Sequence, residues 1–267
     1  MNAAPASPVA LVTGAASGIG RAIAGRLAQA PGTRVLVLDR DAEGAARAAH
    51  EIRAAGGQAR AAVVDLAHTE ALATALPALC GDWGLPDVLV NNAGIAATVP
   101  ATAVTLAQWN GTLAVNLTAP MLLIQQALPH MLAQGWGRIV NIASISGVRA
   151  GTGRLAYGTS KAALIAMTRQ FAIEVAEAGV TVNAVAPGPI DTPLVRQLLA
   201  PGTQSAYAEM VPMRRYGAPE DIADAVAFLA SPGAGYVTGH TLAVDGGFLA
   251  SGVFVRHLFD PPTAEAT

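Results

Sequence analysis

The sequence predicts an α/β fold in which helices cover both faces of one parallel sheet. Short β-branched runs alternate with longer alanine-rich amphipathic stretches along the 267 residues. The runs are apolar throughout, which indicates strands buried on both faces. Regular alternation of strand and helix implies parallel strands joined by right-handed crossovers. No linker rich in Pro, Gly or Ser divides the chain, so we expect a single Rossmann-like, doubly wound domain of about seven strands over residues 1–267.

The elements follow in chain order. The first strand runs into a glycine-rich turn where the first helix begins, and the second and third strands end at Asp39 and Asp65. Between the strands, apolar residues recur at helical spacing. The expected strands are 9–13, 34–39, 61–65, 88–91, 138–142, 180–185 and 242–244. The expected helices are 19–29, 42–55, 69–79, 106–132, 156–178 and 219–229.

Two segments depart from this alternation. Between Pro187 and Pro219 the pattern loosens into proline- and glycine-containing turns around a short apolar stretch. A long segment after a strand end is more often a functional lid than a plain connection, so we expect a substrate lid at about 188–216. A C-terminal extension at about 248–267 follows the last strand. Its apolar part either packs against a partner subunit or belongs to a partly ordered tail; that part contains Phe254, Val255, Leu258 and Phe259.

The composition excludes several classes of function. Hydrophobic residues make up 52% and charged residues 13%, which suits a large core and indicates that other subunits cover some apolar surface. The net charge of -2 without a basic run argues against nucleic acid as a partner. Cys80 alone excludes an intrachain disulfide, the five histidines have no metal-ligand spacing, and no stretch is long and apolar enough to span a membrane. The N-terminus lacks a secretory pattern, so we expect a cytoplasmic protein without metal.

A glycine-rich turn follows the first strand in the segment Val-Thr-Gly-Ala-Ala-Ser-Gly-Ile-Gly. Gly14, Gly18 and Gly20 lack a Cβ, so the backbone can approach a pyrophosphate, and the next helix offers free N–H groups and a positive dipole end. The spacing is G-x3-G-x-G, whereas the standard dinucleotide fingerprint is G-x-G-x-x-G. The turn therefore indicates a dinucleotide site, with a turn that binds no ligand as the alternative.

The end of the second strand bears on the choice of cofactor. Asp39 lies 19 residues past Gly20, where a carboxylate accepts hydrogen bonds from ribose hydroxyls and repels a 2′-phosphate. With the neutral Ser17, this favours NAD over NADP. Arg40 points to the alternative, because it could turn toward a 2′-phosphate. Asp65 could contact the adenine or equally cap the next helix.

Tyr157 and Lys161 form the strongest indication of chemistry. They are four residues apart, so on a helix both lie on one face. A cation beside a phenol favours the phenolate and lowers its pKa from about 10 toward neutrality. The pair therefore predicts a tyrosine that acts as a general acid and base.

These motifs together resemble the short-chain dehydrogenase/reductase family, in particular its members of about 250 residues, over nearly the whole chain. The matching residues are Thr13-Gly14-x3-Gly18-Ile19-Gly20, Asp65, Asn91-Asn92-Ala93-Gly94, Asn116, Ser144, Tyr157-x3-Lys161, Pro187-Gly188 and Gly239 with Asp245-Gly246-Gly247.

The resemblance implies the roles of the site residues. Tyr157 would be the acid–base group, Ser144 would orient the substrate oxygen, and Lys161 would bind the nicotinamide ribose and lower the pKa of Tyr157. Asn116 would anchor a water that links Lys161 to solvent. Ser146 is the competing serine, and Thr192 could instead be a helix cap. The other residues expected at the cofactor are Ile19, Leu66, Asn92, Ala93, Gly94, Pro187, Gly188, Ile190 and Thr192.

The substrate is expected to be a small or medium secondary alcohol or ketone with an apolar portion. Arg149 and Arg154 flank the site, either to meet a carboxylate or phosphate or as solvated loop arginines. The residues expected at the substrate, besides Ser144 and Tyr157, are Ser146, Val148, Leu155, Pro189 and Leu194.

The sequence leaves three functions open. The first is an NAD-dependent dehydrogenase of secondary alcohols, sugar alcohols or related hydroxy compounds. The second is an NADPH-dependent 3-oxoacyl-thioester reductase, which Ser17 and Asp39 disfavour. The third is a non-catalytic dinucleotide-binding sensor. The resemblance also implies a homotetramer built on the helices at 106–132 and 156–178.

Overall fold

A sheet of seven strands runs through the centre of the structure, and all neighbouring strands are parallel. The computed structural model describes residues 3–198 and 201–252. The strands are β1 (Val9–Thr13), β2 (Arg34–Asp39), β3 (Gln58–Val63), β4 (Val88–Asn91), β5 (Gly137–Ile142), β6 (Val180–Pro187) and β7 (Thr241–Val244).

The strand order is β3-β2-β1-β4-β5-β6-β7. The chain builds outward from β1 to β3 on one side and then returns to lay β4 against the other side of β1. In register, Leu11 of β1 pairs with Leu36 of β2 and with Leu89 of β4. The order therefore reverses between β1 and β4, and the predicted doubly wound parallel sheet is confirmed.

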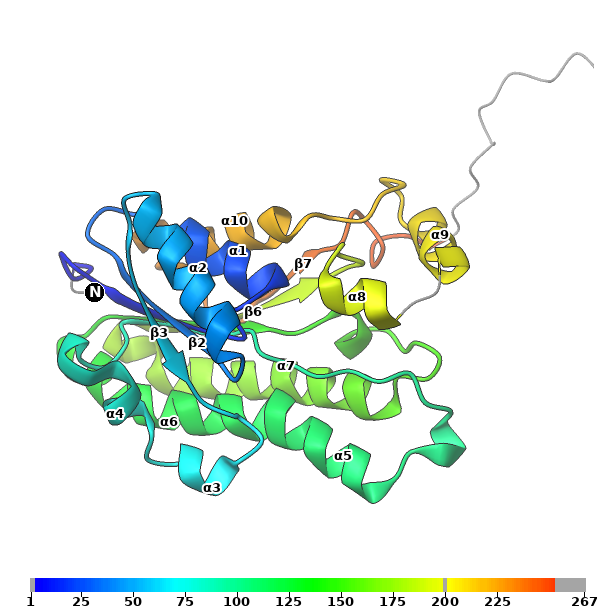
Figure 1. The fold of residues 1–267 in the computed structure, drawn as a ribbon, viewed down its shortest axis with the longest axis horizontal. Coiled ribbons are helices and arrows are strands. Elements are labelled where there is room, and N and C mark those ends of the chain that lie inside the picture. The colour runs from blue at the N-terminus through cyan, green and yellow to red at the C-terminus, as the bar shows by residue number, and fades with distance from the viewer. Residues whose placement is uncertain (1–2, 199–200, 253–267) are drawn as a thin grey trace, which may run out of the picture.

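Helices cover both faces of the sheet (Figure 1). α1, α2 and α10 lie on one face, whereas α4, α5, α6 and α7 lie on the other. The helices are α1 (Gly18–Leu27), α2 (Ala42–Ala54), α3 (Thr69–Leu72), α4 (Leu76–Cys80), α5 (Leu106–Leu113), α6 (Ala119–Gln134), α7 (Leu155–Val175), α8 (Pro193–Leu198), α9 (Pro201–Met210) and α10 (Pro219–Ala230). A π-helical turn, η3 (Ala114–Thr118), joins α5 to α6. Short 3₁₀ turns are η1 (Gly81–Trp83), η2 (Ala101–Ala103), η4 (Ile145–Gly147), η5 (Ala176–Ala178) and η6 (Pro232–Ala234).

Two apolar layers hold the helices to the sheet. Successive side chains of a strand point to opposite faces. Val12 of β1 accordingly packs in the layer with Ile23 of α1 and Val226 of α10, and Leu11 packs in the layer with Leu123 of α6. Burying such side chains contributes roughly 1.5–3 kcal/mol each. This two-sided burial explains why the central strands are apolar throughout.

The third strand begins and ends earlier than expected, at Gln58–Val63 instead of 61–65. β3 is an edge strand paired only with β2, and Gln58 and Arg60 point into solvent. An edge strand needs burial on one face only, so it can contain polar residues that face solvent. Such residues interrupt the continuous apolar pattern, and the start of β3 was therefore not predicted.

Two helices are interrupted where the sequence predicted continuous ones. The stretch 69–79 divides into α3 and α4, with Pro77 in the first turn of α4. Proline has no backbone N–H, so Pro77 cannot donate a helical hydrogen bond to the carbonyl of Ala73, which accounts for the break. The stretch 106–132 divides into α5 and α6 at the π-turn η3, and such turns often mark functional sites.

The expected lid lies beyond the end of the sheet that is opposite the N-terminus, where α8 and α9 are found (Figure 1). No helix of the described residues is long and apolar enough to cross a membrane. Of the C-terminal extension at 248–267, only residues 248–252 belong to the described part, so the expectation for Phe254, Val255, Leu258 and Phe259 falls outside it.

Candidate active site

A cleft of about 390 Å³ lies at the carboxyl ends of the central strands. From β2 toward β5, its walls include Asp39, Gly14, Gly94 and Ser144. The cleft therefore spans the point where the strand order reverses, which is where ligands bind in open α/β sheets. Its volume is in the range of small-molecule sites.

The turn after β1 is held by residues that follow β4. The Thr13 hydroxyl oxygen accepts the backbone N–H groups of Asn92 at 3.0 Å and Ala93 at 2.9 Å. The Asn92 amide donates back to the carbonyls of Thr13 and Gly14, at 2.8 and 3.1 Å. These four bonds fix the two loops to each other. The Asn92 side chain thus holds the turn in place, and Asn92 is also one of the residues that line the cleft.

Gly20 has a packing function that the sequence did not reveal. Gly14 and Gly18 line the cleft as expected, but Gly20 does not. A Cβ on Gly20 would collide with the Gly14 carbonyl oxygen and with the Asn92 amide. The missing side chain therefore lets α1 approach the turn and the loop after β4, which keeps the turn compact.

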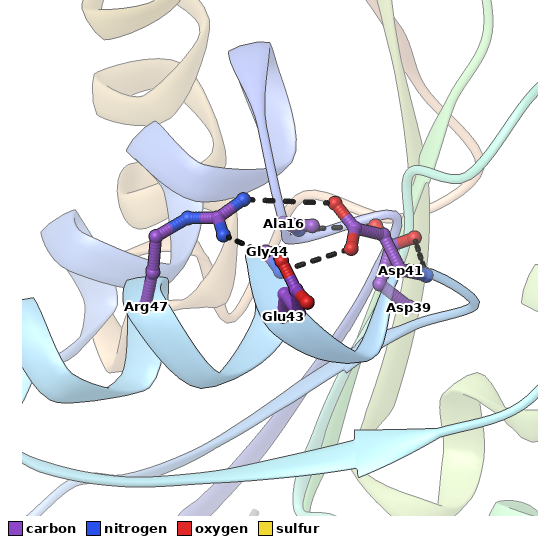
Figure 2. Close-up of polar contacts among 6 residues, drawn as sticks. All are labelled: Ala16, Asp39, Asp41, Glu43, Gly44 and Arg47. Carbon is purple, nitrogen blue, oxygen red and sulfur yellow. Dashed lines mark hydrogen bonds and ion pairs between the residues drawn. The ribbon is translucent and has the colours of Figure 1, made fainter.

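Asp39 is fixed at the end of β2 by two backbone donors (Figure 2). One carboxylate oxygen accepts the N–H of Ala16 at 3.0 Å, and the other accepts the N–H of Asp41 at 3.1 Å. Ala16 belongs to the glycine-rich turn. The carboxylate is thus tied to the same turn that would bind a pyrophosphate, and it lines the cleft.

The two arginines near Asp39 differ in their surroundings. On α2, Arg47 lies 3.5 Å from Glu43 and 3.9 Å from Asp41, and the side chain of Asp41 also caps the helix by accepting the Gly44 N–H (Figure 2). Arg40, in contrast, is exposed, lines the cleft and has no ion pair with any described residue. Arg40 is therefore the arginine available to a ligand at this end.

Asp65 and Thr192 each combine a structural bond with a place in the cleft wall. Asp65 accepts the N–H of Ala67 at 2.9 Å, and Thr192 accepts the N–H of Val195 at 3.2 Å at the start of α8. Both line the cleft. Thr192 thus caps α8 as the alternative had it, whereas Asp65 bonds within the turn before α3, whose N-cap is His68. Both bonds leave cofactor contact open.

Ser144, Tyr157 and Lys161 converge at the other end of the cleft, and all three line it. Ser144 follows β5, and the other two lie one turn apart on α7. The Lys161 ammonium is buried, donates to the Ile142 carbonyl at 2.7 Å and lies 5.8 Å from the centre of the Tyr157 ring. The N–H of Ser146 donates to the Ser144 hydroxyl oxygen at 3.1 Å, so Ser146 supports Ser144 and does not line the cleft itself.

Burial dominates the acid–base properties of this end. It raises the pKa of the Tyr157 phenol, which a hydrogen bond with Ser144 and the charge of Arg154 lower in part. Burial also lowers the pKa of Lys161 to about 8. From the sequence we expected the Lys161 ammonium to lower the pKa of Tyr157. In this structure the contributions that lower it come from Ser144 and Arg154.

Asn116 joins the loop after β4 to α7. Its side-chain oxygen accepts the N–H of Ile95 at 2.8 Å, and its amide donates to the Ile95 carbonyl and to the Ser160 hydroxyl, both at 3.0 Å. A Cβ on Gly94 would lie 3.4 Å from both the Asn116 oxygen and the Lys161 nitrogen. Asn116 therefore lies near Lys161, and its side-chain hydrogen bonds hold the loop after β4 in place.

Most residues expected at the cofactor line the cleft, with Gly20 as the exception. They are Gly14, Ser17, Gly18, Ile19, Asp39, Arg40, Asp65, Leu66, Asn92, Ala93, Gly94, Tyr157, Lys161, Pro187, Gly188, Ile190 and Thr192. The sequence missed Leu38, Val64, Ile95, Val115, Ile142, Ala143, Pro193 and Val195. Several of these directly adjoin a named motif residue, so including the neighbours of each motif would have found them.

The residues expected at the substrate are more scattered. Val148 and Leu155 are 54% and 44% exposed, and neither lines the cleft. Pro189 lines a separate hollow between the lid and β7. Leu194 lies on α8, but its side chain is outside what the structure describes. Their roles stay predictions.

Comparisons with known proteins agree with this site. Residues 14–249 match the family model described as enoyl-(acyl carrier protein) reductase. The chain is 40% identical over 240 residues to the 3-oxoacyl-[acyl-carrier-protein] reductase FabG of Aquifex aeolicus, covering 90% of this chain and 96% of that protein. It is 42% identical over 251 residues to cis-4-hydroxycyclohexanecarboxylate dehydrogenase of Sinomonas cyclohexanicum, with 94% and 100% covered.

A crystal structure agrees as well. It is that of a protein assigned as an NAD(P)-dependent gluconate 5-dehydrogenase from Beutenbergia cavernae, with NADP bound at low occupancy. It has a TM-score of 0.88 at 44% identity and covers 93% of this chain and 100% of that one.

The chain belongs to the short-chain dehydrogenase/reductase family. As a member of the short-chain dehydrogenases/reductases it is an oxidoreductase that binds a nicotinamide dinucleotide. The residues present fit that group. Gly14 and Gly18 leave the turn free of side chains where the cleft passes it, and the space beside Gly94 adjoins the buried Lys161 ammonium.

Proposed function

We propose that the protein is an NAD-dependent dehydrogenase that interconverts a small or medium secondary alcohol, such as a sugar, polyol or other hydroxy compound, and its ketone. One observation carries the proposal. Ser144, Tyr157 and Lys161 line one end of a cleft whose other end is lined by the carboxylate of Asp39.

The proposed chemistry follows from the residues at the Tyr157 end. A bound nicotinamide supplies the redox chemistry by exchanging a hydride with the substrate carbon. For oxidation, the Tyr157 phenolate takes the proton of the substrate hydroxyl. For reduction, the Tyr157 phenol returns that proton to the forming alkoxide, and the Ser144 hydroxyl stabilises the oxygen. The Lys161 ammonium would bind the ribose and keep positive charge beside the phenolate.

The choice of NAD rests on Asp39. Its carboxylate is held in place by two N–H groups, and a fixed negative charge disfavours a 2′-phosphate. Two observations favour NADP instead: Arg40 is exposed beside Asp39, and the Beutenbergia cavernae structure contains NADP. We propose NAD because Asp39 is fixed by its bonds, whereas Arg40 has no bond that directs it toward the cleft.

Fluorescence titration with NADH and NADPH, followed by a panel of secondary alcohols with NAD, tests the proposal. We expect tighter binding of NADH and NAD-dependent turnover of at least one hydroxy compound. Tighter binding of NADPH would overturn the cofactor assignment. Turnover that is undiminished in Tyr157→Phe would overturn the assignment of Tyr157.

A 3-oxoacyl-thioester reductase is the second candidate, and specific observations favour it. The matching family model and the Aquifex aeolicus relative are both named for reductases of acyl carrier protein substrates. The discriminating assay is oxidation of NADPH with a 3-oxoacyl thioester. Rapid turnover there, with none in the alcohol panel, would replace the first proposal.

We also propose that the protein self-associates, as a homotetramer, through the helices at 106–132 and 156–178. Leu106 on α5 and Ile173 on α7 are 73% and 75% exposed, which supports a covered face on these helices. Light scattering after gel filtration measures the molar mass directly. A monomer at micromolar concentration would contradict the proposal.

A further inference from the structure

Arg154 lies beside the tyrosine that we propose as the acid–base group. Its guanidinium carbon is 5.7 Å from the centre of the Tyr157 ring, about as close as the Lys161 nitrogen at 5.8 Å. The ring is therefore flanked by two cations, of which the family resemblance identified only one.

The backbone holds Arg154 in this place. Arg154 is the N-cap residue directly before α7, its N–H donates to the Gly151 carbonyl at 3.3 Å, and its carbonyl accepts the N–H of Gly158. The preceding Gly153 carbonyl accepts the N–H of Val99 at 3.1 Å, which ties this turn to the loop after β4. The start of α7 is thus anchored on both sides, so the arginine is presented to Tyr157 by a fixed backbone.

No carboxylate of the described residues neutralises Arg154. Arg154 forms none of the ion pairs in the described part of the chain, and the first turn of α7 has no acidic residue. Arg149, the neighbouring loop arginine, differs because it donates to the Ser251 carbonyl at 3.3 Å. The positive charge of Arg154 therefore acts on Tyr157 without a competing partner.

The surroundings of α7 contain little other charge. The elements packed most extensively against it are β5, β6, α5, η3, η4 and η5. Among them, the carboxylate is that of Glu177 in η5, which follows the far end of α7. The Arg138 guanidinium of β5 also lies toward that end, because it donates to the Gly179 carbonyl. Within α7, its N-cap residue and these elements, the charged groups at the Tyr157 end are thus Arg154 and Lys161.

We propose that Arg154 is a second cation of the active site, which stabilises the Tyr157 phenolate together with Lys161. This inference rests on the proposed acid–base role of Tyr157. Arg154 acts only through Tyr157: its positive charge favours the ionised form of the tyrosine, so Arg154 is a positioning residue.

The two cations have different uses across the pH range. Burial lowers the pKa of Lys161 to about 8, so its charge is lost as the pH rises through that value, whereas the Tyr157 phenolate is favoured by rising pH. A guanidinium stays protonated throughout. Arg154 consequently keeps a positive charge beside Tyr157 when Lys161 has lost its own.

Direct titration of Tyr157 tests the proposal without any substrate. The chain has four tyrosines. The ultraviolet absorbance of phenolate, measured against pH in the full-length protein and in Tyr157→Phe, therefore gives the titration of Tyr157 by difference. We expect Arg154→Gln, paired with Arg154→Gln/Tyr157→Phe, to raise the pKa of Tyr157 by roughly one unit, a tenfold loss of phenolate at fixed pH.

Two matched variants act as controls. Arg154→Lys keeps a positive charge and should restore most of the shift. Arg149→Gln removes a cation from the neighbouring loop and should leave the titration of Tyr157 unchanged. Thermal unfolding of every variant shows that the titrations compare folded proteins.

Two results would overturn the proposal. One is an unchanged Tyr157 titration in Arg154→Gln, which is also the result expected if Arg154 serves only to bind an anionic substrate. The other is an equal rise of the Tyr157 pKa in Arg149→Gln, which would show that the net charge of the protein causes the effect and not the position of Arg154. Because no turnover is measured, a failure here is distinct from a failure of the proposed dehydrogenase activity.

Discussion

Asp39 accepts the backbone N–H of Ala16 at 3.0 Å, and this bond joins the end of β2 to the glycine-rich turn after β1. The N–H of Asp41 binds the second carboxylate oxygen. A carboxylate has about four acceptor sites, so two donors orient it and leave acceptor capacity for a ligand. The group proposed to distinguish NAD from NADP is thus positioned by the turn proposed to bind the pyrophosphate.

Replacing Asp39 should change the choice of cofactor. Asp39→Asn keeps one acceptor oxygen and removes the charge, so we expect NADH to bind about tenfold more weakly, a loss of about 1.4 kcal/mol, and NADPH to bind more tightly. Fluorescence titration with both cofactors measures this. Asp41→Asn is the control, because Asp41 does not line the cleft and should leave the ratio of affinities unchanged. An unaltered ratio in Asp39→Asn would remove Asp39 from the selection.

Gly44 keeps the start of α2 close to the turn. A Cβ there would lie 2.8 Å from the Ala16 Cβ and would collide with the Asp41 carboxylate. We expect Gly44→Ala to destabilise the protein by about 1–3 kcal/mol, as overpacking does, and to weaken NADH binding. Gly25→Ala is the matched control on α1, because nothing lies within 4 Å of its added Cβ. It should be stabilising by about 0.5–1 kcal/mol. Chemical denaturation measures both, and equal effects would contradict this packing.

The fold was predictable where burial on two faces leaves a plain pattern. The strand Val9–Thr13 was predicted to the residue because each of its side chains is buried. The edge strand β3 was misplaced by two or three residues at each end, since four of its six residues are exposed. The break before Pro77 was missed because apolar periodicity continues across it even though the helix does not.

The site was predictable where one short motif contains all the necessary geometry. Tyr157 and Lys161 share a helical face because they are four residues apart, and the structure places both on the cleft. Contacts between distant loops were not predictable in this way. The packing of Gly20 against Asn92 depends on how β1 and β4 pair, and the approach of Arg154 to Tyr157 depends on the turn before α7. Local spacing contains no information about either.

Removing the Tyr157 hydroxyl should slow turnover severely and spare cofactor binding. Tyr157→Phe keeps the ring and deletes only the proton donor, so we expect kcat to fall by about 10²–10⁴ with little change in NADH affinity. Steady-state kinetics and fluorescence titration separate the two effects. Tyr236→Phe is the control, because Tyr236 is 100% exposed and should behave as the unaltered protein. A parallel loss of cofactor affinity in Tyr157→Phe would indicate that Tyr157 serves mainly to bind the cofactor.

Lys161 should make cofactor affinity depend on pH. Burial lowers its pKa to about 8 in this structure, so the ammonium is present below that pH and is lost above it. Because we propose that the ammonium binds the nicotinamide ribose, NADH affinity should fall as pH rises through about 8. Fluorescence titration at a series of pH values measures the dependence.

Two substitutions identify the titrating group. Lys161→Arg keeps its proton over the whole range, so its NADH affinity should vary little with pH around 8. Lys161→Met lacks the charge, and its affinity should be low and equally insensitive. If the fall near pH 8 persisted in both variants, the titrating group would lie elsewhere and the buried ammonium would have no part in binding the ribose. If the unaltered protein showed no fall, the cofactor would bind the charged and the neutral forms of Lys161 equally well, and the ammonium would have no part in binding the ribose.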